Sequence, residues 1–190
     1  NMNMNLTKSK SPTQYLRWMG CLLILLGLWT TNVNAQLNYT RSTFSSVYST
    51  IAGTAIPGAQ GDDVTGSAIP IGFSFDYNGS VYTTVAANSN GWISFTSTST
   101  SASNPGLATT SLPNATLAPW WDDLSSSSVQ YLTTGTVGSQ VFTMQWVSLS
   151  YYTTSTRTIN YQVKLYEGTN VIEFCYGAVS GTNANGYTSE

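Results

Sequence analysis

The chain has 190 residues, of which 41% are hydrophobic and only 7% are charged, with six Lys and Arg residues against eight Asp and Glu residues. So few basic side chains exclude nucleic acid as a partner, because no basic patch is available to neutralise phosphates. The chain also has no histidine, which excludes the usual Ser-His and Cys-His pairs of nucleophilic enzymes.

The first residues have the order of a signal peptide. Basic side chains between Lys8 and Arg17 precede an apolar run at residues 18–29, and small and polar residues follow up to Ala35. The apolar run covers about a dozen residues, whereas a membrane-spanning helix needs roughly 20. We therefore predict that residues 1–35 are a cleaved signal peptide, that this segment is no permanent membrane anchor, and that the protein is secreted or displayed at the cell surface.

Residues 36–190 are predicted to form one domain that is large enough to bury its own core. Its basic residues are Arg41, Arg157 and Lys164, against all eight acidic residues, so the domain is acidic. Cys175 is the one cysteine in this range, so an internal disulfide is excluded and core packing must supply the stability. Because the sequence ends in a polar stretch without a closing strand, we expect a domain that is truncated at its C-terminal end.

Short runs of β-branched and aromatic residues alternate with turn residues along this domain, which indicates an all-β fold. The strands expected in its first half are residues 69–76, 80–86 and 92–95. Asn78 and Gly79 lie between the first two and favour the positive φ angles of a tight hairpin turn. In the third, Trp92 and Ile93 face opposite sides, so we expect a half-buried strand.

The second half begins with residues 97–115, which are mostly Ser, Thr, Asn, Pro and Gly and predict a long surface loop where a binding edge is expected. The strands expected after it are residues 129–133, 140–151, 159–165 and 172–176. The last two alternate apolar and polar residues around a turn at 168–170, so they should form an antiparallel hairpin with a shared apolar face. Strands at this spacing predict a two-sheet antiparallel β-sandwich, jelly-roll or immunoglobulin-like, in preference to a closed barrel.

Three segments carry a family resemblance: LAPWWDDL at residues 117–124, VFTMQW at residues 141–146 and YQVKLYEGTNVIEFCYG at residues 161–177. Together they resemble a β-sandwich module near the N-terminus of large secreted bacterial surface proteins. Those proteins are especially common in Bacteroidetes, and they often continue with fibronectin-like repeats and a sorting domain for type IX secretion. The module is also distantly similar to nidogen-type extracellular domains. The resemblance implies adhesion or surface display and provides no catalytic residues.

Asp122 and Asp123 are the candidate metal ligands. Ca²⁺ takes about six to eight oxygen ligands, and Asp62 and Asp63 from another loop could add to this pair. The alternative is that one of the two neighbouring aspartates caps a turn through its side chain while the other is solvated. Calcium is therefore the one cofactor that the sequence leaves open.

Trp120 and Trp121 are the candidate ligand-binding residues, because an exposed tryptophan ring offers a flat platform to a sugar. Neighbours on a strand point to opposite faces, so we expect one ring in the core and the other partly exposed. Tyr151 and Tyr152 are weaker candidates for the same role.

Three functions remain open from the sequence. The favoured one is a non-enzymatic module for adhesion or for recognition of extracellular glycan or protein, which predicts an exposed aromatic residue near Trp120 or in the 97–115 loop. The second is a structural spacer or filament-forming domain of a larger surface protein, whose unpaired sheet edge accepts a neighbour's strand. The third is a carbohydrate-active enzyme that uses Asp122 or Asp123 together with Glu173, although a surface-facing Glu173 is the more ordinary interpretation. We expect no enzyme, and we expect contact with following domains of the same polypeptide.

Overall fold

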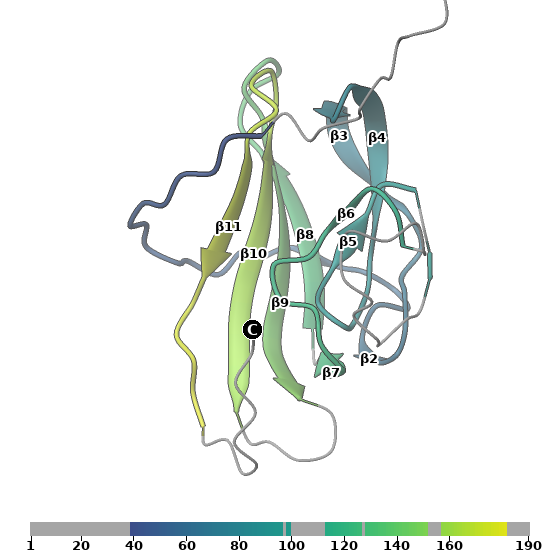
Figure 1. Ribbon diagram of the computed structural model, residues 1–190, viewed down its shortest axis with the longest axis vertical. Coiled ribbons are helices and arrows are strands. Elements are labelled where there is room, and N and C mark those ends of the chain that lie inside the picture. The colour runs from purple at the N-terminus through teal and green to yellow at the C-terminus, as the bar shows by residue number, and fades with distance from the viewer. Residues whose placement is uncertain (1–38, 97, 100–112, 127, 152–156, 182–190) are drawn as a thin grey trace, which may run out of the picture. The chain divides into compact units, whose positions relative to one another are not determined.

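Two antiparallel β-sheets build the domain, and all of the regular structure in its described residues is β (Figure 1). The computed structural model describes residues 39–96, 98–99, 113–126, 128–151 and 157–181. The β-sandwich predicted from the sequence is confirmed. The expected signal peptide lies outside the described residues, and no helix in the described part of the chain is long and apolar enough to span a membrane.

The larger sheet has the strand order β1-β8-β9-β10-β11, with β7 also pairing with β9 and β2 pairing with β7. Its strands are β1 (Thr54–Ala55), β2 (Gly61–Asp62), β7 (Leu124–Ser126), β8 (Ser128–Thr134), β9 (Val141–Tyr151), β10 (Thr158–Tyr166) and β11 (Ile172–Tyr176). The expected hairpin between the last two strands is present, and Tyr161 pairs with Tyr176 in its register. A short turn after β10 therefore places β11 beside it, at the edge of the larger sheet.

The smaller sheet has the order β3-β4-β5-β6. Its strands are β3 (Ile69–Tyr77), β4 (Ser80–Ala87), β5 (Ile93–Ser94) and β6 (Thr116–Leu117). The turn between β3 and β4 has φ angles of 53° at Asn78 and 81° at Gly79, as the Asn-Gly pair predicted. This hairpin is specified by its own sequence.

The core lies between the two sheets, where alternate residues of each long strand point inward. In β3 the inward residues Ile69, Ile71, Phe73 and Phe75 are buried, and the three residues between them are exposed. Burying a large apolar side chain contributes roughly 1.5–3 kcal/mol, so this repeating pattern supplies most of the stability. A side-chain bond also links the sheets, because Thr133 Oγ1 donates to the Ile71 carbonyl oxygen at 2.7 Å.

The prediction of a half-buried strand at residues 92–95 is wrong, because both faces of this segment are buried. Ile93 and Phe95 belong to the core between the sheets. Trp92, on the other face, packs against Trp121, with ring centroids 5.6 Å apart. The loop expected at residues 97–115 lies largely outside the described residues.

The outer face of the larger sheet is covered by residues 48–51, which the sequence did not suggest. Gln145 Oε1 accepts hydrogen bonds from Tyr48 Oη at 3.3 Å and from the Ile51 N–H at 3.0 Å. Gln162 Nε2 donates to Gln145 Oε1 at 2.8 Å and to the Ser49 carbonyl oxygen at 2.7 Å. Both glutamine side chains are buried and bonded, so the segment is attached across β9 and β10.

Candidate functional site

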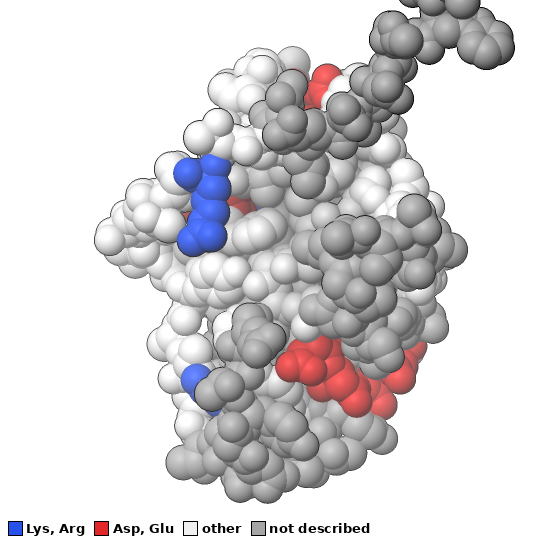
Figure 2. Space-filling model, viewed as in Figure 1, with Lys and Arg blue, Asp and Glu red and all other residues white. Residues whose placement is uncertain are grey.

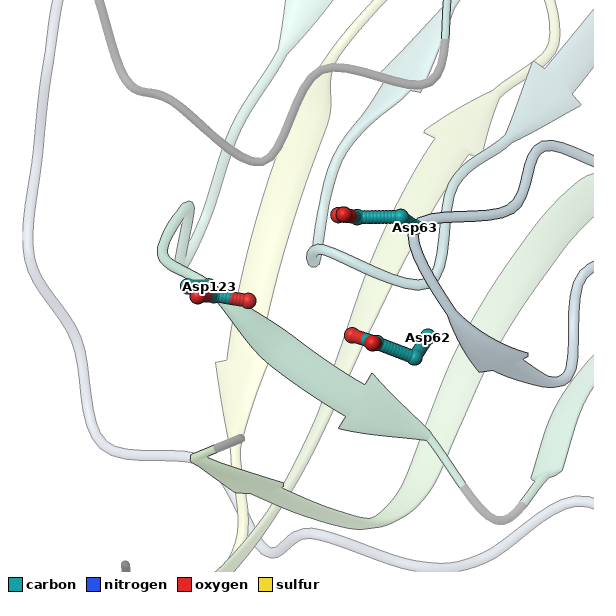
Figure 3. A group of neighbouring side chains, drawn as sticks. All are labelled: Asp62, Asp63 and Asp123. Atoms are coloured by element: carbon teal, nitrogen blue, oxygen red, sulfur yellow. The ribbon is translucent and has the colours of Figure 1, made fainter. Parts of the chain in front are cut away.

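One candidate site is a group of three carboxylates. Asp62, Asp63 and Asp123 each place a ligand oxygen within 4.8 Å of the others, and the three side chains point toward one another (Figure 3). Asp62 ends β2 and Asp123 directly precedes β7, so the antiparallel pairing of these two strands brings the carboxylates together. Figure 2 shows acidic side chains gathered on this face of the molecule, over the part of Figure 1 where β2 and β7 lie.

A buried asparagine holds this carboxylate group in place. Asn90 Nδ2 donates to Asp63 Oδ1 at 2.8 Å, and Asn90 Oδ1 accepts the Leu124 N–H at 2.9 Å. Asn88 fixes the backbone turn that contains Asn90, because Asn88 Oδ1 accepts the Asn90 N–H at 2.6 Å. One amide side chain therefore positions both segments that carry the carboxylates.

The structure separates the two aspartates that the sequence put together. Asp122 is not part of the converging group, and its Oδ1 accepts the Asp123 N–H at 2.9 Å. This is the turn-capping role that was the alternative interpretation. Asp123 is the member of the pair that joins Asp62 and Asp63, both of which the sequence offered as additional ligands.

The electrostatics of the group favour a cation. Burial, with the charge of Asp63, raises the pKa of the Asp62 carboxyl. Burial also raises the pKa of Asp123, and the neighbouring charges of Asp62, Asp63 and Asp122 add to it. Asp62 Oδ1 is shielded from solvent and has no hydrogen-bond partner in the described part of the chain. A hard divalent cation with oxygen ligands, such as Ca²⁺, would relieve both the repulsion and the unpartnered oxygen.

The second candidate site is an aromatic surface beside Trp120. Trp121 is only 9% exposed and packs on Trp92, whereas Trp120 is half-buried. The ring of Tyr176 meets Trp120 edge-on, with centroids 6.5 Å apart, and Tyr176 Oη donates to the Pro119 carbonyl oxygen at 2.8 Å. Tyr176 is 48% exposed, so an exposed aromatic residue lies next to Trp120.

This surface continues along β11. Phe174 pairs with Val163, and Tyr176 pairs with Tyr161, so their side chains lie on the inner, core-facing side of the larger sheet. Phe174 is nevertheless 41% exposed, because β11 lies at the sheet edge away from the smaller sheet (Figure 1). The alternating pattern predicted the correct face for these side chains. It did not indicate that this face extends beyond the area covered by the smaller sheet.

The family model described as NIDO related matches residues 38–190. The chain belongs to the NIDO-related family. The match supports the distant nidogen-like relation that the sequence suggested. Searches of the curated proteins and of the solved structures found no match.

Glu173 of the NIDO-related domain is paired with neighbouring side chains of the larger sheet. Its carboxylate forms an ion pair with Lys164 Nζ at 3.2 Å and accepts a hydrogen bond from Tyr166 Oη. Burial and this bond raise the pKa of Tyr166 to about 12. Glu173 is not part of the described carboxylate group, and the β11 alternation places it on the opposite face from Phe174. The weaker aromatic candidate Tyr151 packs against the core, and Tyr152 lies outside the described residues.

Two site residues would have been hard to find from the sequence. Tyr176 has the same alternation as the buried residues of the neighbouring strand, and only its position at an uncovered edge makes it a surface residue. Asn90 lies in an Asn-Ser-Asn-Gly turn, which normally indicates a solvated loop, yet its side chain is fully buried. In both cases the hydrogen-bond partner of the side chain comes from a distant part of the chain: Pro119 for Tyr176 and Asp63 for Asn90.

Proposed function

We propose that this NIDO-related domain is a non-enzymatic extracellular recognition module that binds glycan or protein in adhesion. The observation that supports the proposal is the exposed ring of Tyr176 beside Trp120, which is where a recognition function predicts an exposed aromatic residue. The resemblance to Bacteroidetes-type surface proteins supports a finer proposal. The chain would then be exported with a signal peptide, displayed at the cell surface and secreted through the type IX route as part of a larger protein.

The geometry suits stacking of a flat ligand. The hydrogen bond from Tyr176 Oη to the Pro119 carbonyl oxygen and the edge contact with Trp120 hold the Tyr176 ring in one orientation. A ring that is fixed before binding loses little conformational freedom when a ligand packs on it. Phe174 adds exposed aromatic area on the same face of β11. Sugar rings and apolar protein side chains both bind to such surfaces.

A glycan array tests this proposal. Residues 36–190 would be applied beside Tyr176→Ala, Trp120→Ala and the control Val137→Ala, which removes a 90% exposed apolar side chain from a turn between β8 and β9. We expect the Tyr176 and Trp120 variants to weaken binding by about tenfold or more and the Val137 variant to bind normally. Trp121 is unsuitable as a probe because it packs on Trp92. If the unchanged domain binds no glycan, glycan recognition is wrong, and the structural-spacer alternative gains support.

Calcium binding at the carboxylate group is a second candidate function. The solvent-shielded, unpartnered Oδ1 of Asp62 favours it. A free calcium concentration of ten times the dissociation constant should stabilise the fold by about 1.4 kcal/mol. This is measured as the difference in melting temperature between samples with calcium and samples with EDTA. Asp123→Asn should abolish the rise, whereas Glu167→Gln makes the same change of charge away from the group and should retain it. An equal response of both variants would contradict a site at these three residues.

A further inference from the structure

The segment before β1 lies against the outer face of β11. Ser46 Oγ lies 3.6 Å from Cys175 Sγ, and a Cβ atom built on Gly177 would lie 3.0 Å from Tyr48 Cδ1. Figure 1 shows this segment passing beside β11 and continuing across the larger sheet. Residues 46–51 therefore form a strap that begins at β11 and leads back toward β1, at the opposite end of the strand order.

The strap follows one row of outward-facing side chains across three strands. In the register of the larger sheet Gln162 of β10 pairs with Gln145 of β9 on one side and with Cys175 of β11 on the other. At β10 the Ser49 carbonyl oxygen accepts a hydrogen bond from Gln162 Nε2 at 2.7 Å. At β9 the Ile51 N–H donates to Gln145 Oε1 at 3.0 Å. The row therefore gives the strap one polar contact on each of the three strands.

The strap is attached more weakly than the strands beneath it. Among the described residues, no backbone–backbone hydrogen bond joins residues 39–51 to either sheet, so each attachment uses at least one side chain. Residues 39–47 are exposed, whereas β10 forms backbone ladders with both of its neighbours. Segments with few bonds and an exposed backbone open at a lower free energy than paired strands. The strap can therefore detach while the two sheets stay folded.

The surface under the strap is polar, which also favours opening. Gln145 and Gln162 are buried on the outer face, and Gln162 Nε2 donates to Gln145 Oε1 at 2.8 Å. When the strap detaches, the two amides keep this bond, and water replaces the partners that the strap supplied. Exposure of polar groups to water carries no hydrophobic cost, unlike exposure of the apolar side chains between the sheets. The outer face can thus be uncovered without loss of the core.

We propose that the strap opens locally in the folded domain and uncovers the Gln145-Gln162-Cys175 row. Cys175 is 3% exposed and is the one cysteine of residues 36–190, so its thiol is accessible only in the open state. The closed strap also lies in the path of a strand that would add at β11, as the structural-spacer alternative requires. The proposal goes beyond glycan recognition, because the ring of Tyr176 lies on the inner face of β11.

The reaction of Cys175 with dithiobis(nitrobenzoate) measures strap opening. The cysteine thiolate attacks the disulfide of the reagent, forms a mixed disulfide and releases one coloured thiolate. We expect residues 36–190, which contain the compact unit Tyr39–Glu190, to react about a hundredfold or more slowly than the same chain unfolded in urea. Below the unfolding transition the rate should change little with urea, because local opening exposes little surface.

Two variants weaken the strap without changing Cys175. Tyr48→Ala removes the ring beside Gly177 and its bond to Gln145, and Gln145→Leu removes the acceptor of two strap bonds. Each variant should speed the reaction by about tenfold or more. Phe44→Ala is the matched control, because it truncates a 65% exposed ring just before the strap, and it should react like the unchanged domain.

A reaction as fast as that of the unfolded chain would overturn the strap as a cover of Cys175. A rate that follows global unfolding in urea would overturn local opening, and so would equal rates in the two strap variants and in Phe44→Ala. Near-ultraviolet circular dichroism identifies a variant that fails to fold, and the other variant then decides. The glycan array tests recognition separately, because no outcome of the thiol reaction depends on a bound glycan.

Discussion

Alanine at Gly91 should destabilise the domain by about 4 kcal/mol. Gly91 has a φ angle of 86°, in the left-handed region where a side chain costs roughly 1–2 kcal/mol. A Cβ atom there would also lie 1.9 Å from the Trp120 carbonyl oxygen and 2.4 Å from Tyr161 Oη. The first neighbour is backbone and the second is a fully buried side chain, so both must move, and overpacking of this kind costs about 1–3 kcal/mol. The sum is a large fraction of a typical folding free energy of about 5–15 kcal/mol.

Urea unfolding followed by tryptophan fluorescence measures this loss, and Gly79→Ala is its matched control. Gly79 has a nearly equal φ angle of 81°, but a Cβ atom there would meet nothing within 4 Å. The control therefore isolates the backbone strain of about 1–2 kcal/mol. The difference between the two variants is the cost of moving the Trp120 segment. If the free energies of unfolding of the two variants agree within about 0.5 kcal/mol, the close approach of the Trp120 carbonyl oxygen to Gly91 does not contribute to the loss of stability. That result would refute the predicted steric cost at Gly91.

Two further predictions concern polar groups. The raised pKa values of Asp62 and Asp123 mean that the folded state binds these protons more tightly than the unfolded state, so stability should fall as the pH rises from about 4 toward 7 in the absence of calcium. Asp123→Asn should reduce that slope in urea unfolding at the two pH values, and an unchanged slope would contradict the carboxylate repulsion. Gln145→Leu removes an acceptor shared by three donors and should cost about 2–3 kcal/mol and expose residues 48–51 to proteases. Gln130→Leu, which loses one local bond to Ser128, should cost less than about 1 kcal/mol.

The sequence predicted those parts of the fold that neighbouring residues determine. The β3–β4 hairpin follows from Asn78 and Gly79, and the β10–β11 hairpin follows from alternation on both sides of a short turn. Turn geometry and a period of two residues are local properties, so they are visible without any knowledge of the packing. The fold class follows from the number and spacing of such strands.

Burial was mispredicted where the covering group comes from elsewhere in the chain. Trp92 is covered by Trp121, and Gln162 is buried beneath a segment whose Ser49 accepts its hydrogen bond. An alternating strand has the same pattern whether its polar face meets water or another segment of the chain. Gln162 is therefore a buried polar residue that no local pattern distinguishes from a solvated one.

The carboxylate group was only partly predictable for the same reason. The Asp122-Asp123 pair was conspicuous, yet adjacency in sequence did not determine which residue would point toward Asp62. That choice depends on the pairing of β2 with β7 and on the clamp provided by Asn90, both of which join distant segments. Residue type thus indicated oxygen donors, whereas tertiary structure determines which carboxylates converge.

The attachment of residues 48–51 across the outer face also constrains the order of folding. The bonds from Ile51 to Gln145 and from Gln162 to Ser49 join residues 94 and 113 positions apart in the chain. A chain that emerges from its N-terminus cannot make the first bond until β9 is available and the second until β10 is available, so its first hundred or so residues have no complete sandwich to fold into. During synthesis residues 48–51 therefore remain unattached until both strands have been made. The synthesis of β10 is then the step that completes the attachment of residues 48–51.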